Sequence, residues 1–154
     1  MRYLATLAIL AGALAPALFV GGPAGAAATP DAAGARADFV VLGAPSAQGV
    51  MRASLCAAGE VFPSGCKRKL VVPAQAARTE VVFTGLPPGR YAFAVLHDED
   101  SSGRLGVSSV SGKFKGFGFS NDARGPGGLP AFDRAAVQVT GDTTAVVHLR
   151  FSMN

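Results

Sequence analysis

From Asp38 onward the sequence is a series of short β-type runs separated by Gly, Pro, Ser and Asp, and no stretch keeps a helical period over three turns. In the run 49–56, apolar Met51 and Leu55 alternate with polar Arg52 and Ser54, the period of a half-buried strand. Similar runs cover 38–42, 49–56, 69–72, 79–84, 90–97, 114–119, 135–140 and 143–151. About seven short strands at this spacing predict an all-β fold, a single Ig-like or transthyretin-like sandwich of two sheets around one core.

Four of these runs carry more specific expectations. Residues 90–97 are apolar on both faces, which is typical of a central strand. Residues 135–140 and 143–151 flank Gly141-Asp142, the signature of a tight hairpin, with His148 on its outward face. Phe117 and Phe119 are expected in the core, with Gly116 and Gly118 permitting a bend between them.

Residues 1–28 have the pattern of a signal peptide. Arg2 precedes an apolar run, and small residues then allow cleavage after Ala26 or Ala28. The apolar run is nearly long enough for an uncleaved membrane anchor, but Pro16 and the break at 21–23 argue against a stable spanning helix. The expected organisation is therefore a signal peptide at 1–28, a flexible lead-in at 29–37 and a sandwich domain at 38–154. Such a chain is periplasmic or secreted, with no transmembrane segment after cleavage.

Charge and cysteine content narrow the function further. The net charge of +4 is mild, and the basic run 67–69 has no interleaved aromatic residues, so a nucleic-acid partner is not expected. The two cysteines, Cys56 and Cys66, predict a disulfide in an exported chain. Their spacing does not match a redox motif, and no histidine lies close enough in sequence to suggest zinc.

The acidic run 98–103 has the spacing of a calcium loop. Oxygen-bearing side chains stand at its first, third and fifth positions (Asp98, Asp100 and Ser102), a glycine follows at the sixth, and the Arg104 carbonyl can add a ligand. The twelfth position is Ser109, so a complete site needs ligands from elsewhere. The best candidates for these further ligands are Asn121 and Asp122. The alternative interpretation is a polar loop in which Asp98 and Ser102 cap backbone N–H groups.

A catalytic interpretation rests on His97 and Ser120. His97 ends a strand beside Asp98 and is a candidate base, with Ser120 as a candidate nucleophile. The segment around Ser120 lacks the second glycine of a nucleophile elbow. A histidine that hydrogen-bonds a nearby turn is the commoner arrangement.

Several segments in combination resemble one known family. The segment 83–93, Phe-Thr-Gly-Leu-Pro-Pro-Gly-Arg-Tyr-Ala-Phe, resembles the turn-strand motif of transthyretin-like and carboxypeptidase-regulatory-like sandwiches. Together with 97–105, 118–123 and 129–133, it resembles the exported bacterial proteins of domain of unknown function 2141. The resemblance covers about residues 50–151 and implies a sandwich fold, an exported location and no established activity. The chain departs from the family pattern at Gly106, where members usually carry an acidic residue, and in its pair of cysteines.

Three functions follow from this evidence. The first is a non-catalytic binding or envelope-associated module, stabilised by calcium in one version, with an envelope or protein partner. The second is a small periplasmic hydrolase that uses His97, an aspartate and Ser120. The third is a structural or adhesive module that pairs through an exposed sheet edge.

Overall fold

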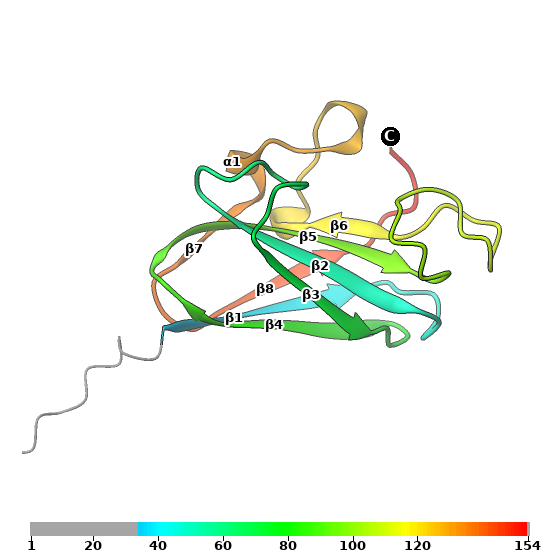
Figure 1. Cartoon of the computed structure of the whole chain (residues 1–154), viewed down its shortest axis with the longest axis horizontal. Coiled ribbons are helices and arrows are strands. Elements are labelled where there is room, and N and C mark those ends of the chain that lie inside the picture. Colours follow the sequence, from blue (N-terminus) through cyan, green and yellow to red (C-terminus); the bar gives the residue numbers. More distant parts are fainter. Residues whose placement is uncertain (1–33, 154) are drawn as a thin grey trace, which may run out of the picture.

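The computed structural model describes residues 34–153, which form two β-sheets packed face to face (Figure 1). The expected signal peptide, with both of its cleavage positions, lies outside the described residues, as does most of the expected lead-in. The eight strands among the described residues are β1 (Ala35–Leu42), β2 (Val50–Ala57), β3 (Arg68–Pro73), β4 (Arg78–Leu86), β5 (Gly89–Asp98), β6 (Phe117–Phe119), β7 (Ala136–Val139) and β8 (Thr143–His148). The predicted all-β sandwich is confirmed.

Each sheet has a simple order. The smaller sheet has the order β4-β1-β8, and the larger has the order β3-β2-β5-β6. Strand β7 also pairs with β5, so β6 and β7 share one edge of β5 at successive positions, Ala94–Leu96 and Gly89–Ala92. Between β6 and β7 lie the short helical turns η2 (Ser120–Asp122), η3 (Pro126–Gly128) and α1 (Phe132–Ala135). No helix of the described residues is long and apolar enough to cross a membrane.

The predicted hairpin of the last two strands is wrong. Strand β7 pairs with β5, and β8 pairs in parallel with β1 in the other sheet. The turn at Gly141-Asp142 therefore carries the chain from one sheet to the other, and Asp142 Oδ1 accepts a hydrogen bond from the Arg36 N–H at 3.0 Å. A turn signal specifies only that the chain reverses. Which strands pair depends on which sheet edges are free, and here β1 and β5 each had one.

The core between the sheets is built around three phenylalanines. Phe39 stacks on Phe93 with ring centroids 4.1 Å apart, and Phe83 meets both rings edge-on. Most buried apolar residues of β1, β2, β4, β5, β7 and β8 join this cluster. The alternation predicted for the run 49–56 is also observed, since Met51, Ala53 and Leu55 are buried in it.

A second apolar cluster lies on the opposite face of the larger sheet. Phe117 and Phe119 are buried there against Ala92 and the segment that leads to β7, so they do not join the main core. Gly118 points the other way, toward β8. A Cβ at that position would lie 2.8 Å from Val147 Cγ1, so glycine is needed for β6 and β8 to approach. Strand β5 is therefore apolar on both faces, as predicted: its inner face packs in the core, and the β6 segment covers part of its outer face, where Ala94 and Leu96 are half-buried.

The predicted disulfide is present. Cys56 near the end of β2 bonds to Cys66, which precedes β3, and closes the loop between them. Figure 1 shows that this loop and the segment from β6 to α1 both lie on the outer side of the larger sheet, away from the smaller sheet. They form two walls over that face.

Candidate functional site

The acidic loop after β5 surrounds the ammonium group of Lys115. Lys115 Nζ lies 2.7 Å from Asp98 Oδ1, 2.6 Å from Ser102 Oγ and 3.0 Å from the Arg104 carbonyl, and it also contacts Asp100 Oδ1. The Lys115 side chain is 1% exposed and that of Asp98 is not exposed at all. Four of the six groups predicted from sequence as calcium ligands thus converge on one point, and an ammonium ion of the protein itself occupies that point.

Further contacts tie the acidic loop after β5 to the larger sheet. Asp98 Oδ2 accepts a hydrogen bond from Arg52 Nε at 2.6 Å and one from the Gly103 N–H at 2.8 Å. Ser102 Oγ accepts a hydrogen bond from the Arg104 N–H. The alternative interpretation, in which Asp98 and Ser102 cap backbone N–H groups, is therefore confirmed. We call Arg52, Asp98, Asp100, Ser102 and Lys115, with the Arg104 carbonyl, the charge cluster.

The cluster shifts the pKa values of its members. Burial alone would raise the pKa of Asp98, but hydrogen bonds from Lys115, Arg52 and the Gly103 N–H hold it below its usual value. Hydrogen bonds from Lys115 and the Ser109 N–H hold the pKa of Asp100 far below its usual range. Burial alone would lower the pKa of Lys115, but Asp100 and Asp98 raise it above its usual value. All three groups are therefore charged at neutral pH.

The other two predicted ligands lie elsewhere. Asn121 Nδ2 donates hydrogen bonds to the carbonyls of Arg134 and Ala136, and Asp122 Oδ1 and Oδ2 both accept hydrogen bonds from His148. Within residues 34–153, no three His, Cys, Asp or Glu side chains gather as a metal-binding group. The predicted set of six therefore does not form one site, because Asn121 and Asp122 each have partners away from Lys115.

His97 and Ser120 are not brought together. The His97 ring is fully buried, and its Nε2 donates to the Gln48 carbonyl at 2.9 Å, in the turn before β2. Ser120 is also buried; its Oγ donates to the Ala135 carbonyl and accepts from the Phe93 N–H. Phe93 is four residues from His97 along β5, about 13 Å at the usual rise of a strand. The predicted hydrogen bond of His97 to a nearby turn is confirmed.

A groove lies on the outer face of the larger sheet, between the two walls formed by the disulfide loop and the segment after β6. It encloses about 490 Å³, within the range of small-molecule sites. Its lining includes Arg52 and Ser54 of β2, Lys69 and Val71 of β3, Ala94 and Leu96 of β5, Phe117 and Phe119 of β6, and Pro63, Leu105 and Leu129 of the loops.

The groove combines exposed apolar side chains with positive charge. Val71, Leu105 and Leu129 are 55%, 41% and 46% exposed, although large apolar residues are usually covered. No Asp or Glu lines the groove. Arg52 is already paired with Asp98, whereas Lys69 makes no ion pair with any other described residue. The groove therefore presents one uncompensated positive charge beside an apolar surface.

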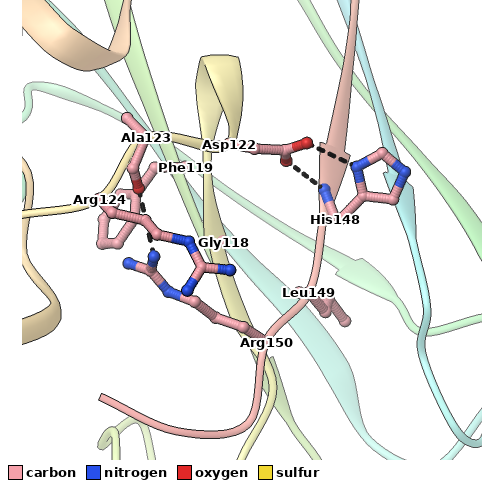
Figure 2. Close-up of a pocket in the computed structure, with 8 residues that line it drawn as sticks. All are labelled: Gly118, Phe119, Asp122, Ala123, Arg124, His148, Leu149 and Arg150. Atoms are coloured by element: carbon pink, nitrogen blue, oxygen red, sulfur yellow. Dashed lines mark hydrogen bonds and ion pairs between the residues drawn. The ribbon is translucent and has the colours of Figure 1, made fainter. Parts of the chain in front are cut away.

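A smaller cavity of about 120 Å³ lies where β8 ends beside β6 (Figure 2). Asp122 and His148 pair at its rim, and the side chains of Arg124 and Arg150 come from either side. His148, expected on an outward face, has a side chain that is 60% exposed. Sequence patterns did not single out Arg124, Arg150 or Lys115, and they identified Lys69 only as part of the basic run 67–69. For Lys115 a signal existed, because a lysine inside the apolar run 114–119 needs a counter-charge.

These observations define a class of protein: an all-β sandwich with a buried charge cluster at one end and a groove across its larger sheet. The family model described as "Uncharacterized protein conserved in bacteria (DUF2141)" matches residues 40–147, from within β1 to within β8. The chain belongs to this family, as its motifs predicted. Searches of curated proteins and of solved structures found no match. The family is uncharacterised, so membership in it assigns no activity.

The first prediction concerns the lysine of the charge cluster. The substitution Lys115→Met leaves Asp98 buried without its main counter-charge, and removing one partner of a buried ion pair costs about 3–5 kcal/mol. We expect the free energy of unfolding, measured with urea, to fall by about that amount. The matched control is Lys113→Met, because Lys113 is exposed and its loss should change stability by less than about 0.5 kcal/mol. Equal stability of the two variants would contradict a stabilising role for Lys115.

The second prediction concerns pH. The folded-state pKa values of Asp98 and Asp100 lie below the unfolded value of about 3.9, so their contribution is complete above about pH 4 and is lost as the pH falls further. The pKa of Lys115 is raised, so its contribution is complete below about pH 10.4 and is lost as the pH rises. Urea unfolding across pH should give a plateau with a decline on each side. If the stability of Lys115→Met declined at alkaline pH as much as that of the parent, Lys115 would not be the group responsible for the decline.

Proposed function

We propose that this chain is an exported, non-catalytic binding domain that holds an apolar ligand bearing a negative charge in the groove of its larger sheet. The observation that carries the proposal is the lining of that groove: three exposed apolar side chains, an uncompensated lysine and no acidic residue. The Cys56–Cys66 disulfide and the predicted signal peptide support a periplasmic or secreted location.

The shape of the groove favours a ligand over a folded partner. Its floor is strand β5 and strand β6, where the backbone is fixed by pairing on both sides of β5. Its walls are the disulfide-closed loop and the segment from β6 to α1. A site on paired strands, with one wall closed by a disulfide, needs little ordering when a ligand binds, which favours affinity.

The two alternative functions receive less support. A hydrolase would need His97 beside a hydroxyl group and open to a cavity, but His97 is buried and distant from Ser120. An adhesive module would need an unprotected sheet edge. Strand β3, one of the edge strands among the described residues, carries Arg68, Lys69 and Pro73, and charged or proline residues on an edge discourage pairing with another chain.

The third prediction tests the groove with dodecanoate, a carboxylate with an apolar chain. Calorimetric titration of the oxidised protein should show saturable binding. The double substitution Leu105→Ser/Leu129→Ser removes exposed apolar surface and should weaken binding about tenfold or more. Lys69→Gln should weaken it more at low salt than at high salt, because an exposed charge is screened by ions.

The control is Val146→Ser, since Val146 is 46% exposed but lies on β8, in the smaller sheet. It should bind dodecanoate like the parent. A similar loss of affinity in the control, or no saturable binding by the parent, would refute the groove as the ligand site.

The fourth prediction concerns calcium, which the loop spacing suggested. Because Lys115 already supplies a cation to Asp98, Asp100, Ser102 and the Arg104 carbonyl, we expect millimolar calcium to leave the unfolding midpoint of the parent unchanged relative to EDTA. In Lys115→Met the same oxygens are released, and calcium should raise the midpoint. A ligand at a hundred times its dissociation constant adds about 2.7 kcal/mol.

Magnesium serves as the ion control, because it demands a tighter octahedral arrangement than this loop offers. A calcium-specific rise in the parent, lost in Asp98→Ala and Asp100→Ala, would show instead that calcium binds the loop directly.

A further inference from the structure

The cavity in Figure 2 contains an arginine whose charge is fixed in place without a counter-ion. The guanidinium group of Arg150 lies over the rings of Phe117 and Phe119, at 4.7 and 5.2 Å from their centroids. It donates hydrogen bonds to the carbonyls of Ala123 (3.3 Å) and Gly128 (2.5 Å). All these partners are neutral. The buried Nε atom of Arg150 has no hydrogen-bond partner among the described residues.

A second positive charge faces the same cavity. Arg124 is exposed and makes no hydrogen bond or ion pair through its side chain within residues 34–153. Burial, followed by the nearby charge of Arg124, lowers the pKa of Arg150, and Asp122 opposes this only in part. Two guanidinium groups at one cavity repel each other, and an anion between them would relieve that repulsion.

The carboxylate oxygens of Asp122 are not directed at the two arginines. Its Oδ1 accepts the backbone N–H of His148 at 2.8 Å, and its Oδ2 accepts Nδ1–H of the same residue at 2.7 Å. Both oxygens are therefore committed to His148, as Figure 2 shows. The pairing places the proton of the imidazole ring on Nδ1 and leaves Nε2 at the rim of the cavity. Asp122 thus orients the histidine, and its charge offsets that of the two arginines only in part.

We propose that this cavity binds a phosphate group, held between the guanidinium groups of Arg124 and Arg150. Guanidinium presents a planar fork of donors that matches phosphate oxygens. The cavity volume of about 120 Å³ is several times what a single water needs, which leaves room for a phosphate group. Arg150 is already immobilised on two aromatic rings, so little order is lost when the anion binds. The site goes beyond the proposed groove function and uses different charged residues.

The fifth prediction is that inorganic phosphate binds saturably at this cavity. It is tested by NMR titration of the oxidised protein, in which sodium chloride is adjusted to keep the ionic strength constant. Saturable amide shifts should be confined to residues 118–124 and 148–150. Arg124→Gln should weaken phosphate binding about fivefold or more, as expected for the loss of one exposed charge contact of about 1 kcal/mol.

The matched control is Arg134→Gln, which removes the same charge from another exposed position and should leave phosphate affinity unchanged. A parallel titration with glycerol 3-phosphate distinguishes free phosphate from a phosphate ester as the ligand. Equal affinity indicates recognition of phosphate alone, and tighter binding indicates a phosphate ester. Shifts no larger than those from chloride, or equal weakening in both variants, would overturn the proposal. Dodecanoate binding is measured by calorimetry and tested at Leu105, Leu129 and Lys69, none of which lines the phosphate cavity, so either result can fail alone.

Discussion

The ion pair between Lys115 and the two aspartates of the loop after β5 holds one end of the sandwich together. Without the ammonium, the buried Asp98 would keep only Arg52 as a counter-charge, which would destabilise the folded domain. With it, residues 98–104 fold back around one point, and Arg52 ties that loop to β2. The segment from 105 to 115 must then return to the same place, which sets where β6 begins and hence where Phe117 and Phe119 lie.

Strand β5 connects this cluster with both apolar layers. Its inner residues Tyr91, Phe93 and Val95 pack in the core, and its outer residues Ala94 and Leu96 form the floor of the groove. A strand that is apolar on both faces is normally buried on both. Here the outer face is covered by the β6 segment at one side and left open over the rest. The open part, with Lys69 at its border, is what a ligand can reach.

Much of the fold could be predicted because it depends on local patterns. Alternation at 49–56 predicted β2 and its buried face, and the run at 90–97, apolar on both faces, predicted the central strand. The pair of cysteines predicted the disulfide. The prediction failed for the last two strands, because a Gly-Asp turn between two β-type runs has the same local pattern whether the strands pair with each other or with separate sheets. In the candidate site, loop spacing identified the correct oxygens, but it could not identify the cation, which comes from a residue eleven positions beyond Arg104.

The sequence alone therefore determined the fold class, the family, the disulfide and the set of oxygen atoms that gather after β5, since each depends on residues close together along the chain. Only the tertiary structure decided that Lys115 is their cation, that Asn121 and Asp122 bond to other parts of the chain, and that Arg124 and Arg150 meet at one cavity. Those contacts join segments that are far apart in sequence or belong to different sheets. Their distances follow from sheet order and burial, and neither is encoded in any single stretch of residues.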